Sequence, residues 1–300
     1  MKVLVAGGSG FIGSYLIDAL TARGHRVTCL SRSTTRRTSS AENWRGDALE
    51  PASMAGALER HDAVINLIGI IRAFPSRGIT FPRFHVEATR NLLDATRKAG
   101  VKRFIQMSAN GASPDGIAEY QTTKAQGEEL VRVSGLDWTI FRPSVVFGKP
   151  PEGKIEFCTQ LGRSFKFAPV IPVFGDGNYR LQPIHAKDVA AAFAGALDNP
   201  ASIGKTFHLG GDVAYSYREI LNLIFIGMGK TPRAKLPVPW FLAKPVFSLL
   251  GSFAFFPATA DEIEMLMAGN RVPETEYIKF FDIAPTPFNA ENLAYLKETV

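Results

Sequence analysis

The sequence of 300 residues has very little cysteine, and Cys29 and Cys158 are its only two cysteines. Two thiols are too few for a disulfide framework or a cysteine-based metal site, so we predict no metal centre and expect a reducing compartment. Cys29 falls in a predicted core strand and is interpreted as a small buried hydrophobe. Hydrophobic residues make up 46% and charged residues 21% of the chain, a balance that predicts an ordinary globular protein with a sizeable core.

An uninterrupted apolar run is also missing. The longest apolar stretch, Trp240–Ala258, contains Lys244, Pro245 and Pro257, whereas a membrane span needs about 20 consecutive apolar residues. Positive charge is dense only at residues 32–37, which have no aromatic neighbours, so neither a spanning helix nor a nucleic-acid surface is predicted. The first predicted strand begins at residue 2, so we expect no signal or transit peptide before the fold. We therefore predict a cytoplasmic protein.

The most informative feature is a glycine-rich turn after that first predicted strand, Lys2–Ala6. The turn fits the dinucleotide-binding fingerprint, and a helix with one apolar face is predicted over Phe11–Arg23, with Gly24 at its end. In this fingerprint one glycine makes the tight turn, another lets the backbone approach a pyrophosphate, and a third lets helix and strand pack closely. A turn without a ligand is the alternative. The predicted cofactor-binding residues of the turn are Gly7, Ser9, Gly10, Phe11, Ile12 and Gly13.

The end of the second predicted strand, Arg26–Leu30, indicates which dinucleotide binds. NAD-preferring folds usually place an acidic residue near this point to bind the ribose hydroxyls, but here Ser31 and Arg32 follow the strand and Arg36 comes close behind. A carboxylate would repel a 2′-phosphate, whereas a guanidinium can pair with it. We therefore predict NADP(H) as the preferred cofactor. NAD(H), with a solvated arginine cluster on the loop, is the alternative.

Strands and helices alternate over the first half of the chain, which predicts an α/β fold with a Rossmann-type doubly wound parallel sheet. We place the dinucleotide-binding domain at residues 1–148, with elements at about 180–210 returning to it. Residues 149–300 break the alternation and are predicted to form a smaller, irregular substrate or partner lobe.

Ligands of such sheets bind at the carboxyl ends of the strands. The predicted strand at residues 63–70 therefore places Leu67, Ile68 and Gly69 beside the cofactor. Asp47, ahead of a predicted short helix at residues 50–60, is assigned either to cap that helix or to contact the adenine.

Three polar residues could carry chemistry. Tyr120 and Lys124 lie four residues apart at the start of a predicted helix, and hence on one face of it. An ammonium beside a phenol lowers the tyrosine pKa from about 10, and the phenol can then exchange a proton with a substrate oxygen. Ser108, at the end of the preceding predicted strand, could hydrogen-bond the same oxygen. A surface pair without a catalytic role is the alternative for Tyr120 and Lys124.

With these motifs the sequence resembles the short-chain dehydrogenase/reductase superfamily, as an atypical, extended member of its NAD-dependent epimerase/dehydratase branch. The motifs that carry the likeness are Gly7–Gly13, Gly46-Asp47, Ser108-Ala109, Tyr120-Gln-Thr-Thr-Lys124 and Arg142–Gly148. The resemblance implies that Ser108, Tyr120 and Lys124 are the catalytic positions and that Lys124 also reaches the nicotinamide ribose. It further implies that four residues line the nicotinamide: Pro143, Ser144, Val145 and Val146.

Within this branch the sequence is most similar to the nucleotide-binding accessory subunit of respiratory complex I and its bacterial relatives. The segments that carry this narrower likeness are 135–139, 182–185 with 188–190, 237–239 and 283–287. The resemblance departs from sugar-nucleotide enzymes at the short segment 109–119 and at His85, where those enzymes often have Asn. His185 is assigned a capping or hydrogen-bonding role outside the site.

Two functions remain open at this point. The first is an NADP(H)-dependent oxidoreductase of the epimerase/dehydratase type that acts on an unidentified small molecule. The second is a non-catalytic, nucleotide-stabilised accessory protein of a membrane-associated complex, attached to a partner or to the inner face of the membrane. The apolar stretch 240–256 would form a substrate lid in the first case and a membrane or partner surface in the second.

Overall fold

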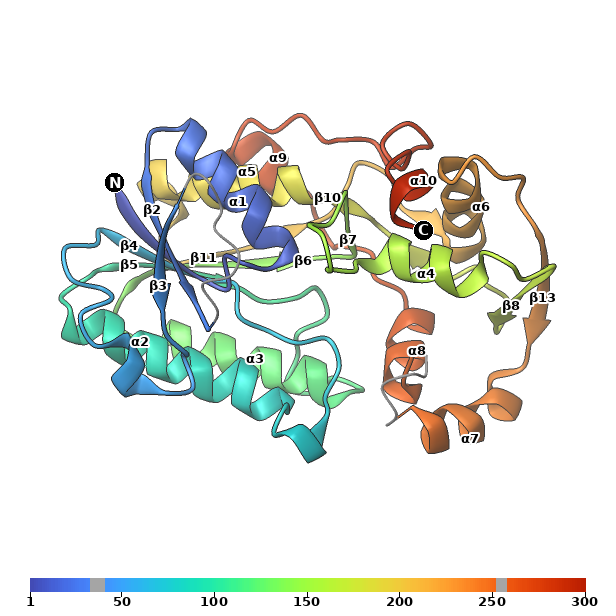
Figure 1. Cartoon of the computed structure of the whole chain (residues 1–300), viewed down its shortest axis with the longest axis horizontal. Coiled ribbons are helices and arrows are strands. Elements are labelled where there is room, and N and C mark those ends of the chain that lie inside the picture. The colour runs from blue at the N-terminus through green and yellow to red at the C-terminus, as the bar shows by residue number, and fades with distance from the viewer. Residues whose placement is uncertain (33–40, 252–257) are drawn as a thin grey trace. The chain divides into compact units, whose positions relative to one another are not determined.

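The computed structural model describes residues 1–32, 41–251 and 258–300, and it divides into two compact units, each with its own core (Figure 1). Unit 1 comprises Met1–Pro143, Ala186–Leu209 and Glu276–Ala284. Unit 2 comprises Ser144–His185, Gly210–Thr275 and Pro285–Val300. The predicted cofactor residue Arg36 lies outside the described residues.

Unit 1 is built on a seven-stranded, wholly parallel sheet with the order β3-β2-β1-β4-β5-β6-β11. β1 lies inside the sheet, and β2 and β3 extend the sheet from β1 to one edge. The chain then returns, and β4, β5, β6 and β11 extend the sheet from the other side of β1. The predicted doubly wound parallel sheet is confirmed, and its switch point lies between β1 and β4. The strands are β1 (Lys2–Ala6), β2 (Arg26–Ser31), β3 (Glu42–Arg45), β4 (Ala63–Asn66), β5 (Arg103–Met107), β6 (Asp137–Pro143) and β11 (Lys205–Leu209).

Helices cover both faces of this sheet (Figure 1). On one face α1 (Phe11–Ala22) packs against α5 (Ala186–Asp198), and on the other α2 (Ala88–Lys98) lies beside α3 (Glu119–Arg132). The short α9 (Glu276–Phe280) packs on β11. The central strands are apolar on both faces because both are covered, and every residue of β4 is buried.

One predicted helix of unit 1 does not form. Residues 50–60 form only a 3₁₀ turn at Pro51–Met54, because Gly56 and Arg60 adopt positive φ angles of 79° and 60° that end any helix. Ahead of α2, residues Pro82–Glu87 form a π-helical turn that continues into that helix. That turn brings His85 into the interior, where it is 2% exposed.

Unit 2 combines short strand pairs with helices. Its helices are α4 (Phe157–Phe165), α6 (Tyr217–Gly227), α7 (Trp240–Leu250), α8 (Ala260–Met267) and α10 (Leu296–Thr299). Its strands pair as β7 (Val146–Phe147) with β10 (Ile184–His185), β8 (Val170–Phe174) with β13 (Ala234–Val238), and β9 (Arg180–Leu181) with β12 (Tyr215–Ser216). Its core gathers aliphatic and aromatic residues of α4, α6, β8 and the last twenty residues of the chain. None of the helices in the described part of the chain is long and apolar enough to cross a membrane.

Candidate functional site

The glycine turn between β1 and α1 brings two backbone segments into direct contact. Gly7 has a φ of 83°, and a Cβ there would lie 3.1 Å from the carbonyl carbon of Leu67. A Cβ on Gly13 would lie 2.4 Å from the carbonyl oxygen of Gly8, so only glycine lets α1 pack this close to the turn. The end of β4 and the glycine turn therefore line the same edge of the sheet, at its switch point.

The start of α1 fits a dinucleotide pyrophosphate. Gly10 is the N-cap residue and offers no side chain to the first-turn amides, which are thus available to phosphate oxygens. Ser9, Phe11 and Ile12 are half-buried around this turn. A bulkier or acidic N-cap residue would fill or repel the position that the phosphates need.

Lys124 connects the helix α3 to this edge of the sheet. Its side chain is 5% exposed, and its Nζ donates to the carbonyl oxygen of Met107 at 3.4 Å. A Cβ on Gly69 would lie 2.8 Å from Nζ, so the ammonium group lies directly against the Gly69 backbone. The Leu67–Gly69 segment consequently contacts the glycine turn at one end and Lys124 at the other.

Tyr120 lies one turn before Lys124 and packs in an aromatic cluster. Its ring makes T-shaped contacts with the rings of His85 and Phe81, at centroid separations of 5.4 Å and 5.8 Å. The His85 ring is fixed at both nitrogens, by the Thr123 hydroxyl on Nδ1 at 2.9 Å and by the Ile70 carbonyl oxygen on Nε2 at 3.0 Å. These contacts hold the phenol on the same helix face as Lys124.

Burial dominates the titration of these groups. It raises the pKa of Tyr120 to about 12 and lowers that of Lys124 to about 8, the nearby Glu128 carboxylate opposing the second shift. Burial and the Lys124 charge lower the pKa of His85 to about 2, so this imidazole is neutral at physiological pH. The predicted lowering of the Tyr120 pKa is therefore wrong for the chain without ligand, because desolvation outweighs any effect of the ammonium.

Ser108 follows β5, and its side chain is buried, with an exposed fraction of 3%. It faces the carboxylate of Glu128, one helical turn beyond Lys124. Burial alone would raise the Glu128 pKa, but hydrogen bonds from Arg142 at 2.6 and 2.7 Å, with lesser help from Ser108 and Arg132, lower it instead. The Ser108 hydroxyl thus lies between the carboxyl end of β5 and the Glu128 carboxylate.

The residues predicted to select the cofactor are only partly described. Ser31 ends β2, and its carbonyl oxygen accepts from the Gly46 amide at 3.0 Å. The Arg32 guanidinium lies over the Phe84 ring, 5.8 Å from its centroid. Asp47 accepts from the Leu49 amide at 3.0 Å and so makes a turn rather than capping the predicted helix, which does not form.

The segment after β6 is divided between the two units. Pro143 ends β6 in unit 1, and its carbonyl oxygen accepts from the Asn110 amide at 2.8 Å. Ser144, Val145 and Val146 belong to unit 2, where the Ser144 hydroxyl donates to the Gln182 carbonyl oxygen and Val146 pairs with Ile184. Their predicted contact with the nicotinamide stays a prediction.

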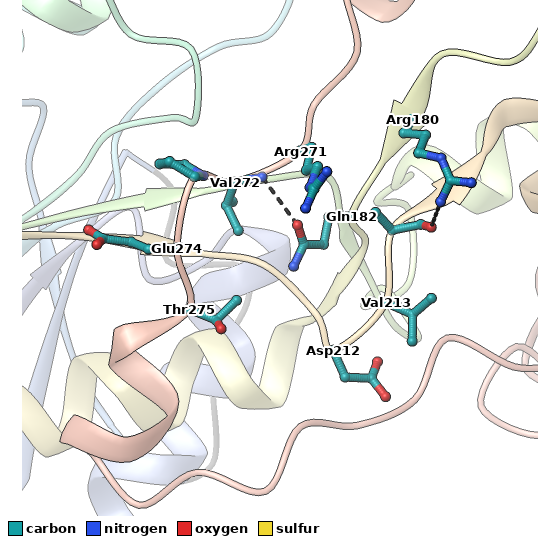
Figure 2. Close-up of a pocket in the computed structure, with 10 residues that line it drawn as sticks. Arg180, Gln182, Asp212, Val213, Arg271, Val272, Glu274 and Thr275 are labelled. Atoms are coloured by element: carbon teal, nitrogen blue, oxygen red, sulfur yellow. Dashed lines mark hydrogen bonds between the residues drawn. The ribbon is translucent and has the colours of Figure 1, made fainter.

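Unit 2 has a pocket of its own, of about 480 Å³ (Figure 2). Gln182 lies at its centre, accepting from the Val272 amide at 3.2 Å and donating to the Gly211 carbonyl oxygen at 2.6 Å. Arg180 is held by the Ala214 carbonyl oxygen at 3.0 Å. The wall also carries Arg271, Asp212 and Glu274, so the pocket offers charges of both signs to a polar ligand.

A family model described as the NAD dependent epimerase/dehydratase family matches residues 3–210, more than half of the chain. The chain belongs to this family. Membership agrees with the glycine turn and the parallel sheet, and the family is one that binds a nicotinamide dinucleotide. The resemblance inferred from the sequence is confirmed.

Two relatives and one solved structure are similar to this chain. The chain is 28% identical over 307 residues to NADH dehydrogenase (ubiquinone) 1 alpha subcomplex subunit 9, mitochondrial, of Rattus norvegicus, covering 98% of this chain and 79% of the relative. It is 28% identical over 250 residues to the ceramide reductase of Caulobacter vibrioides, covering 80% and 75%. The fold matches UDP-glucuronic acid 4-epimerase from Bacillus cereus, solved with UDP-glucuronic acid and NAD, with a TM-score of 0.75 at 20% identity and full coverage of both chains.

Three neighbours of the Tyr120–Lys124 pair were not predicted from the sequence. His85 and Phe81 contact Tyr120 from a π-helical turn that no sequence pattern announces. Glu128 could have been found, because Tyr120, Lys124 and Glu128 repeat every four residues and therefore share one face of α3. Arg142, which donates to Glu128, is the first residue of the Arg142–Gly148 motif, from which only contacts with the nicotinamide were predicted.

Proposed function

We propose that this family member is an NADP(H)-dependent oxidoreductase in which Tyr120 exchanges a proton with a substrate oxygen. The observation that carries the proposal is the contact of Lys124 with Gly69. It joins the Tyr–Lys face of α3 to the Leu67–Gly69 segment, whose other end lines the glycine turn. Cofactor and proton donor then meet at the switch point of one sheet.

The protein's own groups favour carbonyl reduction. The glycine turn at the start of α1 would hold NADPH, whose chemistry would be hydride donation, and Tyr120 gives its hydroxyl proton to the carbonyl oxygen of the substrate. With a pKa of about 12 the phenol is protonated at neutral pH and ready to donate. Lys124 holds positive charge beside the resulting phenolate, and the buried Ser108 hydroxyl at the end of β5 would turn to hydrogen-bond the same oxygen. The name of the ceramide reductase relative agrees with this direction.

Preference for NADP(H) over NAD(H) is part of the proposal. The turn after β2 presents Ser31 and Arg32 and no carboxylate, and Arg32 is exposed over the Phe84 ring, where its guanidinium can pair with a 2′-phosphate. Arg32→Glu should weaken NADPH binding and leave NADH binding nearly unchanged. Equal thermal stabilisation of the wild-type protein by the two cofactors would contradict the preference.

The enzyme proposal is tested with Tyr120→Phe, which removes one oxygen and keeps the ring that packs on His85. NADPH oxidation is followed with a panel of ketones that includes long-chain keto-lipids. We expect Tyr120→Phe to bind NADPH as tightly as the wild type and to lose at least a hundredfold in turnover, the range of general acid catalysis. Turnover that is unaffected by Tyr120→Phe would refute the assigned role.

The second candidate is an accessory subunit in which the dinucleotide is held for stability. The similarity to a complex I subunit over 98% of the chain favours it, as does α7, which carries Phe241 at 73% and Leu249 at 72% exposure. Such a helix suits a protein or membrane partner. One outcome distinguishes the two candidates. If NADPH binds and stabilises the protein, but the protein reduces no carbonyl substrate even when it is associated with its membrane, the accessory-subunit candidate is supported.

A further inference from the structure

Unit 2 exposes a phenylalanine between lysines. Phe167 follows α4 and is 84% exposed, the largest exposed fraction among the large hydrophobic side chains of the described residues. Lys166 Nζ lies 5.5 Å and Lys230 Nζ 5.7 Å from the centroid of its ring. The two lysines come from the ends of α4 and α6, so the tertiary fold, and not local sequence, builds this arrangement.

The cations around Phe167 are positioned by main-chain oxygens. Lys230 donates to the Lys166 carbonyl oxygen at 3.1 Å, and Arg233 donates to that of Ala168 at 3.1 Å. Arg163 and Lys166 donate to the main-chain oxygens of the last two residues at 2.7 to 2.9 Å. Within the described ranges Lys230 and Arg233 form no ion pair with a carboxylate, so their charge is available to an external anion.

An apolar strand face continues from Phe167. In the parallel pair β8–β13, Val170 lies opposite Ala234 and Pro172 opposite Leu236, and all four are exposed. Val170 is 43% and Leu236 58% exposed. The opposite face, with Ile171 and Val173, is buried in the core of unit 2, so the exposed apolar face is not needed for folding.

We propose that Phe167, Lys166, Lys230, Arg233 and the exposed β8–β13 face form a docking surface for an anionic membrane. Peripheral membrane attachment combines an aromatic side chain that enters the interface with cations that meet lipid phosphates. A nucleic acid fits less well, because the ammonium groups already lie over the ring face on which a base would stack. This surface adjoins α7, which follows β13 directly, but it shares no residue with α7 or with the site in unit 1.

The test is cosedimentation of the full chain with phosphatidylcholine vesicles, with and without phosphatidylglycerol. We expect binding only to the anionic vesicles and its loss at high salt. Phe167→Ala should weaken the partition coefficient about tenfold. The double variant Lys166→Gln with Lys230→Gln should weaken it about 25-fold, at roughly fivefold per cation. Lys98→Gln with Lys102→Gln is the matched control, since it removes the same charge from exposed positions of unit 1 and should bind like the wild type.

Three results would overturn the proposal. The first is no binding to anionic vesicles, or binding that the Phe167 and lysine variants leave unchanged while their circular dichroism matches the wild type. The second is binding that Phe241→Ala abolishes and Phe167→Ala does not, which would assign attachment to α7. The third is lysine-dependent binding to heparin or single-stranded RNA that does not need Phe167. None of these readouts uses the site in unit 1, so the result is independent of whether the oxidoreductase function holds.

Discussion

At the scale of single residues, burial pushes each titratable group around Tyr120 toward its uncharged form. The pKa of Tyr120 rises to about 12, that of Lys124 falls to about 8, and that of His85 falls to about 2. Glu128 is the exception: its carboxylate is kept ionised by Arg142 and favours the charged form of Lys124. The ammonium group of Lys124 therefore depends on a charge held one helical turn away.

The first prediction concerns the pH dependence of carbonyl reduction. Lys124 carries its proton below about pH 8 and loses it as the pH rises through that value. Because the ammonium stabilises the phenolate left on Tyr120, we expect kcat/KM to fall as the pH rises through about 8, far below the Tyr120 pKa. Lys124→Arg keeps its charge to much higher pH, so this variant should be slower at pH 7 but lose the alkaline fall near 8. An unchanged profile would show that another group titrates.

The second prediction concerns His85, which is buried and hydrogen-bonded at both ring nitrogens. His85→Leu leaves the Thr123 hydroxyl and the Ile70 main chain without a partner, and should lower the free energy of unfolding at pH 7.5 by about 2 kcal/mol. It should also reduce turnover, because the Tyr120 ring loses its neighbour. His61→Leu is the control: it removes a buried histidine with one bond to Thr28 and should cost stability without affecting turnover.

The His85 prediction has a definite sign in acid. Below about pH 6.5 the unfolded chain protonates His85, whereas the folded chain does not until about pH 2. As the pH decreases below 6.5, this one group therefore lowers the free energy of unfolding of the wild type by up to about 1.4 kcal/mol per pH unit. The stability deficit of His85→Leu should shrink accordingly between pH 6.5 and 5 in urea unfolding curves. A deficit that is constant with pH would mean that His85 is not buried as a neutral ring.

At the scale of elements, the sequence predicts the regular part of unit 1 well. β1, α1 and β2 follow their apolar patterns to within one residue, because each buries one face or both against a neighbour. The π-helical turn at Pro82–Glu87 and the 3₁₀ turn at Pro51–Met54 could not be predicted, because tertiary packing decides them. The π-helical turn also carries His85, which explains why the sequence indicated Tyr120 and Lys124 but not their neighbour.

The last third of the chain was harder to predict for a different reason. β13 and α7 carry exposed apolar residues, so periodicity does not separate an inner face from an outer one. Proline at positions 237, 239 and 245 further obscures the pattern. The elements whose sequence is least regular are thus the ones with surfaces suited to partners.

The third prediction separates two roles within the glycine turn. Gly13→Ala places a Cβ 2.4 Å from the Gly8 carbonyl oxygen, a backbone clash that should lower stability by about 1–3 kcal/mol with or without cofactor. The nearest contact of a Cβ on Gly10 is 3.2 Å, so Gly10→Ala should fold nearly normally and lose mainly nucleotide affinity. Thermal melts with and without NADPH distinguish them. If Gly10→Ala kept full affinity, the pyrophosphate would not lie at the α1 N-terminus.

At the scale of the whole molecule, the chain passes between the two units five times, after Pro143, His185, Leu209, Thr275 and Ala284. Unit 1 cannot be completed before residue 284, since its edge strand β11 and the helices α5 and α9 come from later segments. Neither unit corresponds to a continuous piece of sequence. Stability in one unit is therefore linked by the chain itself to folding of the other.

The fourth prediction follows from this interleaving. We expect one cooperative transition in calorimetry, although unit 1 and unit 2 have separate cores, because unfolding either one releases the chain ends that the other must hold. NADPH should shift that single transition as a whole, adding about 2.7 kcal/mol at a hundredfold excess over its dissociation constant. A chain cut after Pro143 lacks β11 and α5. It therefore exposes the part of the sheet that α5 covers beside α1, and it should bind no NADPH. Two transitions, of which only one moves with NADPH, would show instead that unit 1 folds on its own and that the crossings carry no coupling.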